Sequence, residues 1–306
     1  MHMGKINRIL LILSVVCSLI ISGCSLPGLG GPAKNTIRIG TLATSESQII
    51  GHIIRELIEH YTDIPVSMVS NLGSSIVQHK AMMNGDVDIT ATRYTGTDLA
   101  GVLGMEPVKD PKEALEIVQR EFAERFDQTW FDSYGFANSY AFTVRKEVAE
   151  ENNLQTVSDL QSLAQNLKFG VDNSWLKRKG DGYEGFVEEY GFQFGETFPM
   201  QIGLVYQAAA NGRMDVVLAY STDGRIAAFD LKVLEDDKYF FPPYDSSLVA
   251  RNDVFEKYPE LRDILQKLSG KIDTETMRAI NYEADGMMKE PAIIAKEFLE
   301  ANNYFE

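Results

Sequence analysis

The stretch NGDVDITATRYTGT, residues 84–97, decides the fold because a second stretch repeats its pattern. Residues 211–222, NGRMDVVLAYST, follow the same order. In both, a helix is expected to end at Asn-Gly, an Asp opens an apolar strand, and the strand leads to a Tyr followed by a hydroxyl residue. Gly is a common residue just after a helix, and a short apolar run bounded by turn residues is typical of a buried strand. Two copies of this unit predict two similar α/β halves.

A second pair of similar segments lies at residues 144–148 (VRKEV) and 250–254 (ARNDV). Each follows an apolar, strand-like run and precedes a helix-like segment, and we interpret the pair as marking two crossings between the halves. The predicted fold is therefore an α/β clamshell with a ligand cleft between two lobes. Lobe one would be discontinuous, with residues 37–143 and 247–306, and lobe two would comprise residues 144–246.

The region before the first crossing alternates between strand and helix patterns. Strands are expected at residues 36–42, 65–69 and 87–92, separated by a helix with an apolar face from Ile49 to Ile58 and by a helix at residues 75–84. This order is typical of a parallel sheet. Further helices are expected after Asp110, where Pro111 and Glu113 complete an N-terminal signature, and in two segments between residues 274 and 302, the second opening near Pro291.

Four tyrosines fall where this topology places the cleft. Ligands of such sheets bind at the carboxyl ends of the strands, which is where Tyr94 and Tyr220 lie. Tyr140 is close to the first predicted crossing and Tyr244 to the second. One tyrosine at a strand end is usually a packing residue, but four that converge on one cleft favour a binding site.

A cleft lined by tyrosines suits a quaternary ammonium group. Such a cation has no N–H to donate, so a carboxylate gains little specificity for it. Aromatic faces attract it by about 0.5–2 kcal/mol each, and more when water is excluded. Closure of two lobes would exclude that water.

The N-terminal segment, residues 1–23, is typical of a lipoprotein signal peptide. A basic start precedes an uncharged run, residues 9–21, which is shorter than the roughly 20 residues that span a membrane. The run ends in ISGC, residues 21–24, which looks like a bacterial lipobox that would place a diacylglycerol on Cys24. Residues 24–36 would form a Gly/Pro-rich tether. An ordinary signal peptide and a retained membrane anchor are the alternatives.

The composition excludes several classes of protein. The 306 residues are 44% hydrophobic and 24% charged, with a formal net charge of −15, which excludes collagen-like and disordered chains. The negative sign argues against nucleic acid as a partner and against docking on anionic lipid by charge. We interpret the acidity as a solvated exterior.

No catalytic or metal-binding set stands out. The four histidines lack the spacing of zinc ligands, and the chain has neither a G-x-S-x-G elbow nor a candidate catalytic cysteine. The glycines at 28–31 follow no strand and do not form a phosphate loop. We expect no enzymatic activity, no cofactor and no metal.

Longer motifs resemble those of one family of receptors. They are TIRIGTLATSESQII (36–50), NGDVDI and RYTGT (84–97), GFANSYAFTVRKE (135–147), VVLAYSTDGRI (216–226) and FFPPYDSSLVAR (240–251). Together with the lipobox, they resemble the substrate-binding lipoproteins of OpuB/OpuC-type osmoprotectant ABC importers, over nearly the whole chain from Cys24. The resemblance implies a two-lobed fold of the type II periplasmic binding proteins and no activity as an enzyme.

The resemblance also implies a ligand, a site and partners. The ligands would be trimethylammonium osmoprotectants (glycine betaine, carnitine and choline), delivered to a membrane permease and its ATPase. Its tyrosine cage matches Tyr94, Tyr140, Tyr220 and Tyr244, and its polar contact beside the cage matches Asn138. Thr97 matches a position that bears on specificity, where a neutral hydroxyl can donate a hydrogen bond to either a hydroxyl or a carboxylate tail. Gln48, at the start of the first helix, could donate to a ligand carboxylate.

Other interpretations stay open at this point. An amino-acid-binding lipoprotein would need an Asp or Glu for the ammonium group and an Arg for the carboxylate, and a sensory module would have the same cleft. Trp175 could line the rim of the cleft or pack beneath a loop, whereas Trp130 is expected in a core. We expect a monomer on the extracellular face of a bacterial membrane.

Overall fold

The computed structural model describes residues 35–178 and 180–305. Cys24, the predicted signal peptide and nearly all of the predicted tether lie outside these residues. Within the described part of the chain, no helix is both long enough and apolar enough to span a membrane.

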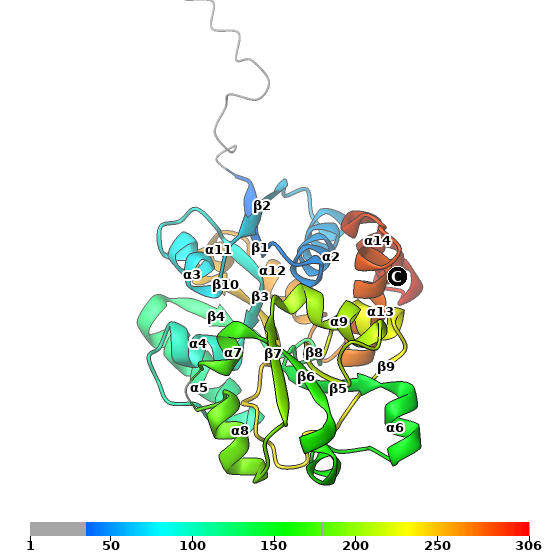
Figure 1. The fold of residues 1–306 in the computed structure, drawn as a ribbon. Coiled ribbons are helices and arrows are strands. Elements are labelled where there is room, and N and C mark those ends of the chain that lie inside the picture. The colour runs from blue at the N-terminus through cyan, green and yellow to red at the C-terminus, as the bar shows by residue number, and fades with distance from the viewer. Residues whose placement is uncertain (1–34, 179, 306) are drawn as a thin grey trace, which may run out of the picture. The chain divides into compact units, whose positions relative to one another are not determined.

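The first lobe is built on a five-stranded sheet of order β2-β1-β3-β10-β4 (Figure 1). Its strands are β1 (Ile37–Leu42), β2 (Val66–Leu72), β3 (Ile89–Tyr94), β4 (Gln128–Trp130) and β10 (Ser246–Arg251). Strand β1 pairs in parallel with β2 and β3, as predicted, while β10 is antiparallel to both β3 and β4. The sheet is therefore mixed, and β3 begins and ends two residues later than expected.

The helices of the first lobe include all those predicted from the sequence. They are α2 (Ser45–Tyr61), α3 (Ser75–Met83), α4 (Thr95–Gly101), α5 (Pro111–Phe126), α11 (Asn252–Lys257), α12 (Leu261–Gln266), α13 (Thr274–Asp285) and α14 (Pro291–Ala301). Asp110 caps α5 by accepting a hydrogen bond from the Glu113 N–H, and Pro111 and Pro291 open α5 and α14.

The second lobe has its own five-stranded sheet, of order β7-β6-β8-β5-β9 (Figure 1). Its strands are β5 (Tyr140–Arg145), β6 (Lys168–Asp172), β7 (Glu196–Met200), β8 (Val216–Tyr220) and β9 (Leu231–Val233). Its helices are α6 (Lys146–Asn152), η1 (Ser158–Ser162), η2 (Ala164–Asn166), α7 (Asn173–Leu176), α8 (Tyr183–Tyr190), α9 (Ile202–Ala210) and α10 (Gly224–Ala228).

Helix α2 anchors the first lobe. It begins at Ser45 because the Thr44 side chain accepts a hydrogen bond from the Ser47 N–H. The predicted apolar face is fully buried between the sheet and α14: Ile49, Ile50, Ile53, Ile54, Leu57 and Ile58. Each such side chain contributes about 1.5–3 kcal/mol when it is removed from water. The start of α2, which lies at the cleft, is therefore held by strong packing further along the helix.

The repeat seen in the sequence is a repeat of structure. Gly85 and Gly212 follow α3 and α9 with positive φ angles of 72° and 68°, which favour glycine. Asp88 and Asp215 then precede β3 and β8. Each accepts a hydrogen bond from a backbone N–H of the neighbouring strand, at 2.8 Å and 3.0 Å.

An arginine completes each copy of the repeat. Arg145, at the end of β5, lies 3.1 Å from the Asp215 carboxylate, and Arg251, at the end of β10, lies 3.9 Å from that of Asp88. Each guanidinium covers the glycine of its own copy, where a Cβ would lie about 3 Å from it. The similar segments at residues 144–148 and 250–254 thus each supply an arginine that ties an antiparallel strand to its neighbour in the sheet.

The segments that precede β5 and β10 run side by side. Ala137 and Asp245 form an antiparallel bridge, and the Asn138 N–H donates to the Tyr244 carbonyl at 3.1 Å. We propose that the chain crosses between the lobes here. The crossing predicted at residue 143 falls inside β5, and the membership of that strand in the second sheet favours a boundary just before it.

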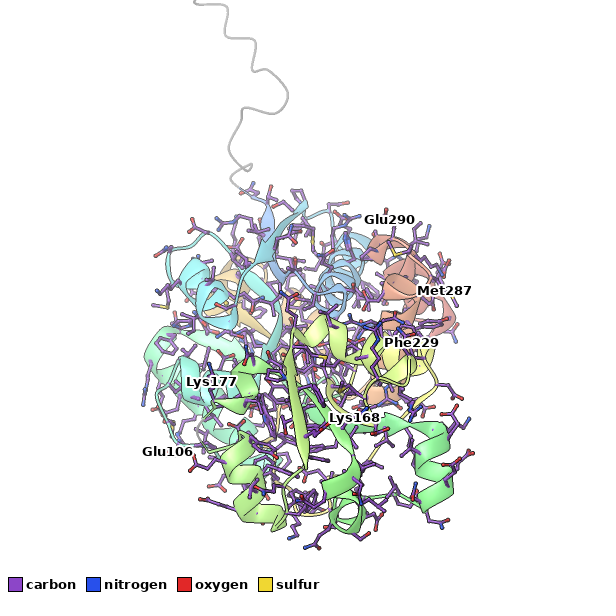
Figure 2. The ribbon with its side chains drawn as sticks, in the orientation of Figure 1. Glu106, Lys168, Lys177, Phe229, Met287 and Glu290 are labelled. Atoms are coloured by element: carbon purple, nitrogen blue, oxygen red, sulfur yellow. The ribbon has the colours of Figure 1, made fainter. Side chains whose placement is uncertain are left out.

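Charged side chains cover the outside of the molecule. Figure 2 labels Glu106 and Glu290 near the margin of the fold, and these two residues and Lys168 are exposed. This arrangement agrees with the interpretation of the acidity as a solvated exterior.

One buried ion pair fixes the turn between β3 and α4. The side chains of Arg93 and Asp98 are both 0% exposed, and the guanidinium donates to the carboxylate at 2.6 Å and 2.8 Å. The guanidinium also lies 5.3 Å from the ring centre of Phe122. The pair holds the turn that carries Tyr94 and Thr97.

Asp98→Ala should therefore destabilise the protein by about 3–5 kcal/mol, because it leaves the Arg93 charge buried without a partner. Urea unfolding followed by circular dichroism measures this loss. Asp110→Ala is the matched control and should cost only about 1 kcal/mol, since it removes one exposed helix cap. A loss for Asp98→Ala no larger than the control's would contradict the role of the pair.

Candidate ligand-binding site

Tyr140 and Tyr220 are cross-strand neighbours in the second sheet. They are register partners at the ends of β5 and β8, and their ring centres are 5.2 Å apart with the planes inclined at 38°. The Phe241 ring lies 5.8 Å from that of Tyr140. Behind them, the Tyr206 hydroxyl accepts a hydrogen bond from the Tyr220 N–H at 3.0 Å. Antiparallel pairing thus places two of the predicted tyrosines in one aromatic group.

Tyr94 and Tyr244 are brought together at the matching edge of the first sheet. Tyr94 ends β3, and the next residue, Thr95, donates its N–H to the Asp245 carbonyl at 3.2 Å. The Tyr244 ring packs over Gly96, where a Cβ would lie 3.3 Å from the ring and 2.7 Å from the Pro243 carbonyl oxygen. Only glycine allows this approach, so Gly96 sets the position of the Tyr244 ring.

Arg178 connects the two pairs of tyrosines. Its guanidinium lies 5.8 Å from the ring centre of Tyr140 and donates to the Tyr244 hydroxyl at 2.7 Å. It also forms an ion pair with Asp181 at 2.8 Å. Arg178 was not predicted from the sequence, because nothing in its loop distinguishes it from other cations in surface loops.

Glu46 is the second residue that the sequence analysis missed. Its side chain is 3% exposed and accepts hydrogen bonds from the Tyr94 hydroxyl at 2.6 Å and from the Asn138 amide at 3.1 Å, both at Oε1. The Asn281 amide of α13 donates to Oε2 at 3.3 Å and to the Thr222 carbonyl at 2.8 Å. Acidic residues are common in the first turn of a helix, so the sequence offered no reason to single this one out.

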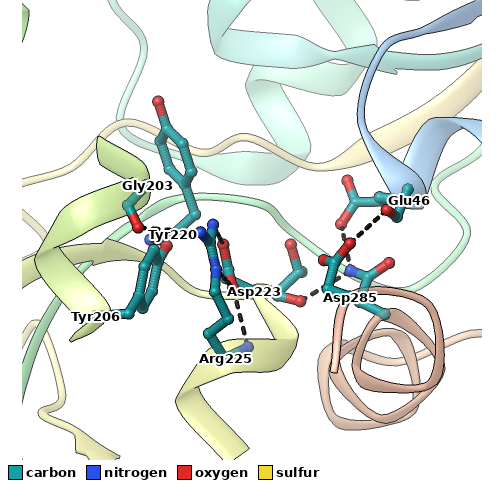
Figure 3. A network of polar contacts seen from close by, with 10 residues as sticks. Glu46, Gly203, Tyr206, Tyr220, Asp223, Arg225 and Asp285 are labelled. Atoms are coloured by element: carbon teal, nitrogen blue, oxygen red, sulfur yellow. Dashed lines mark hydrogen bonds and ion pairs between the residues drawn. The ribbon is translucent and has the colours of Figure 1, made fainter. Parts of the chain in front are cut away.

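These contacts join both lobes at one end of the site (Figure 3). Glu46 and Ser45 come from the start of α2, and α13 contributes Asp285, which accepts a hydrogen bond from the Ser45 hydroxyl at 2.5 Å. From the second lobe, Arg225 forms an ion pair with Asp223 at 2.6 Å, and its guanidinium stacks on the Tyr206 ring at 4.2 Å.

A cavity of about 450 Å³ lies among these residues. Its lining includes Glu46, Asn138, Tyr220 and Asn281. A cavity of this size accommodates a small organic ligand. Two of the predicted site residues, Asn138 and Tyr220, thus share a cavity with the buried carboxylate.

Two further predicted site residues, Thr97 and Gln48, are not among those that line this cavity. Thr97 is half-buried in α4, next to the glycine on which Tyr244 packs. Gln48 lies within α2, where its amide is 3.4 Å from the Ala43 carbonyl and 3.5 Å from the Asn71 side chain. Their roles stay predictions.

Both tryptophans belong to cores. Trp175 is fully buried in the second lobe and donates from its indole nitrogen to the Asp181 carbonyl at 2.7 Å, although its ring centre is 6.4 Å from that of Tyr140. It therefore supports the site from beneath. Trp130 packs against Phe122 in the first lobe. Within the described residues, no group of three or more histidine, cysteine or acidic side chains is arranged to hold a metal ion.

Two α/β lobes, each with its own five-stranded sheet, and an aromatic group at the strand ends define a solute-binding protein of the type II class. Residues 35–301 match the family described as the substrate binding domain of the ABC-type glycine betaine transport system. The chain belongs to this family.

Its relatives include proteins of known specificity. The carnitine transport binding protein OpuCC of Listeria monocytogenes is 60% identical over 96% of each chain. The solved structure described as a glycine betaine/carnitine/choline ABC transporter is 57% identical, with a TM-score of 0.85 over 88% of this chain and all of its own. The ergothioneine transport permease/binding protein EgtU of Helicobacter pylori is 35% identical over 86% of this chain and 47% of its own length.

The pKa values of three site tyrosines are raised. Burial, followed by the nearby Glu46 carboxylate, raises the pKa of Tyr94 well above its usual value. Burial also raises the pKa values of Tyr220 and Tyr244, with neighbouring Tyr140 and Asp181 as the next causes. These hydroxyls stay neutral in the folded state at a pH where the unfolded chain ionises.

The stability that these phenols contribute should be complete below about pH 10 and fall as the pH rises above it, because the unfolded state then loses protons first. Tyrosinate absorbance measures the effect: the native protein should ionise fewer tyrosines at about pH 10 than the urea-unfolded chain. Tyr94→Phe should lower the absorbance of the unfolded chain and leave that of the native protein unchanged. Equal ionisation of both states would contradict the burial of these groups.

Proposed function

We propose that this chain is the extracellular solute receptor of an osmoprotectant ABC importer and that it binds the quaternary ammonium solutes glycine betaine, carnitine and choline. The observation that carries the proposal is the aromatic group of Tyr140, Tyr220 and Phe241, which Arg178 connects to Tyr244. The family of the chain and the names of its relatives support the same ligand class.

Binding would use ring faces to hold the trimethylammonium group. Each correctly oriented face contributes about 0.5–2 kcal/mol, and the methyl groups bury apolar surface at the same time. Closure of the lobes would remove water and strengthen both effects. Asn138 would contribute a polar contact beside the cage.

Arg178 is a candidate partner for the carboxylate of a zwitterionic ligand. It keeps its charge, because Tyr244 and Asp181 outweigh the effect of burial and raise its pKa. Its guanidinium has five N–H donors, and those not used by Tyr244 and Asp181 remain for a ligand carboxylate. Thr97 would serve either a carboxylate or a hydroxyl tail, and Gln48 a carboxylate.

The remaining parts of the proposal concern the setting of the receptor. It would be a monomer held by a lipid on Cys24 at the extracellular face of a bacterial membrane, with no enzymatic activity of its own. Its protein partners would be the permease and ATPase subunits of the importer. The lipobox motif and the family support this setting.

An amino-acid receptor is the second candidate function, and the charges of two site residues favour it. Glu46 supplies a carboxylate for the ammonium group of such a ligand, and Arg178 supplies a cation for its carboxylate. A primary ammonium group would donate hydrogen bonds to Glu46, whereas a trimethylammonium group would not. Titration calorimetry with proline and glycine beside glycine betaine, carnitine and choline separates the two candidates.

Tyr220→Ala should weaken binding of glycine betaine by at least about 100-fold, because it removes one ring face and opens the cage. Tyr220→Phe should cost only a few-fold, since the face remains. Calorimetry on the purified receptor measures both. Tyr239→Ala, at a tyrosine that is 74% exposed, is the matched control and should bind like the wild type. If no quaternary ammonium solute binds the wild type below millimolar concentration, the proposed function is wrong.

Arg178→Ala should weaken glycine betaine and carnitine by roughly 10- to 100-fold while it leaves choline nearly unchanged, because only the first two carry a carboxylate. Lys177→Ala removes an adjacent, exposed charge and should leave all three affinities unaltered. An equal loss for choline would show that Arg178 only supports Tyr140 and Tyr244.

A further inference from the structure

Within residues 35–178 and 180–305, Glu46 has no positively charged partner. Among the residues that the structure describes, its carboxylate is in hydrogen-bond contact with a phenol and two amides and forms no ion pair. Arg225, which lines the same cavity, is paired with Asp223 instead. A buried carboxylate that lacks a countercharge is costly even when it is fully hydrogen-bonded.

The amides around Glu46 add further negative oxygen atoms. Asn138 and Asn281 turn their Nδ2 groups toward the carboxylate, and the side-chain oxygen of each is buried without a hydrogen-bond donor. Asn281 is 3% exposed, so its oxygen does not reach bulk water. Glu46 therefore lies at the cavity wall with two unpartnered acceptors buried beside it, and Asp223, Arg225 and Asp285 line the same cavity.

A group that suits this wall carries positive charge. A trimethylammonium group spreads its charge over its methyl C–H groups, which form weak contacts with oxygen acceptors. Of the predicted cage tyrosines, Tyr94 donates a hydrogen bond to Glu46 and Tyr220 lines the cavity. Arg178 is not among the residues that line this cavity and lies over the Tyr140 ring.

We propose that Glu46 is the counter-anion of the bound quaternary ammonium group and that it makes the receptor select ligands by their net charge. The inference rests on the proposed function. Glu46 attracts the cationic end of any such ligand and repels a carboxylate, so a zwitterion binds with its carboxylate directed toward Arg178. Choline, which has no carboxylate, receives the full attraction, and glycine betaine receives only the difference between the two effects.

The test is Glu46→Gln, which retains the size of the side chain and removes its charge. Titration calorimetry should show choline weakened by at least about 10-fold and glycine betaine by less than about 3-fold, since opposite effects partly cancel for the zwitterion. Glu59→Gln, on an exposed part of the same helix, changes the net charge equally and should alter neither affinity.

Tyr94→Phe distinguishes the attraction of Glu46 for the ligand cation from the support that Glu46 gives to the Tyr94 side chain. It removes the donor to Glu46 but keeps the carboxylate, so it should weaken choline and glycine betaine by similar factors. If Glu46→Gln also weakens the two ligands by similar factors, Glu46 only holds Tyr94 in place and the proposal is overturned. If the wild type binds neither ligand, the proposed function itself fails, which is a different result.

Glu46→Asp guards against a folding artefact. It keeps the charge on a shorter side chain, so the ratio of choline to glycine betaine affinity should stay closer to the wild-type ratio than in Glu46→Gln. A ratio in Glu46→Asp equal to that in Glu46→Gln would overturn the assignment of selectivity to charge.

Discussion

The antiparallel pairing of β5 with β8, and of β10 with β3, is the constraint on which the site depends. Tyr94 and Tyr220 are the last residues of strands that run toward the cleft. Tyr140 is the first residue of a strand that runs away from it, and Tyr244 lies two residues before another. Because an antiparallel strand begins where its neighbour ends, Tyr140 lies beside Tyr220 in the second sheet, and Tyr244 lies near Tyr94 in the first. All four tyrosines are therefore at the strand ends that face the cleft.

Much of this arrangement could be predicted from the sequence. The repeated Asn-Gly, the Asp and the closing Tyr are local signals, and the structure confirms them as a helix end, a strand start and a strand end in each lobe. The apolar face of α2 and the cap at Asp110 follow from equally local rules. The sheet to which residues 140–145 belong was harder to predict, because their strand pattern looks the same in either sheet.

The charged residues of the site could not be predicted in this way. Glu46 resembles any acidic residue in the first turn of a helix, and Arg178 resembles any cation in a surface loop. What sets Glu46 apart is its set of partners, Tyr94, Asn138 and Asn281, which are 48, 92 and 235 residues away in the chain. Such a group is created by the tertiary fold, and no pattern of neighbouring residues reports it.

In each lobe a glycine, an aspartate and an arginine tie two strands together, and their position bears on how such a receptor can evolve. Asp88 and Asp215 precede their strands, while Tyr94 and Tyr220 end them, so the residues that tie the strands together lie a full strand length, roughly 17–20 Å, from the aromatic edge. Substitutions at the cleft therefore leave the anchoring contacts untouched. A chain built in this way can acquire a new solute preference through a few changes at the aromatic strand ends, while the contacts at the opposite strand ends are kept.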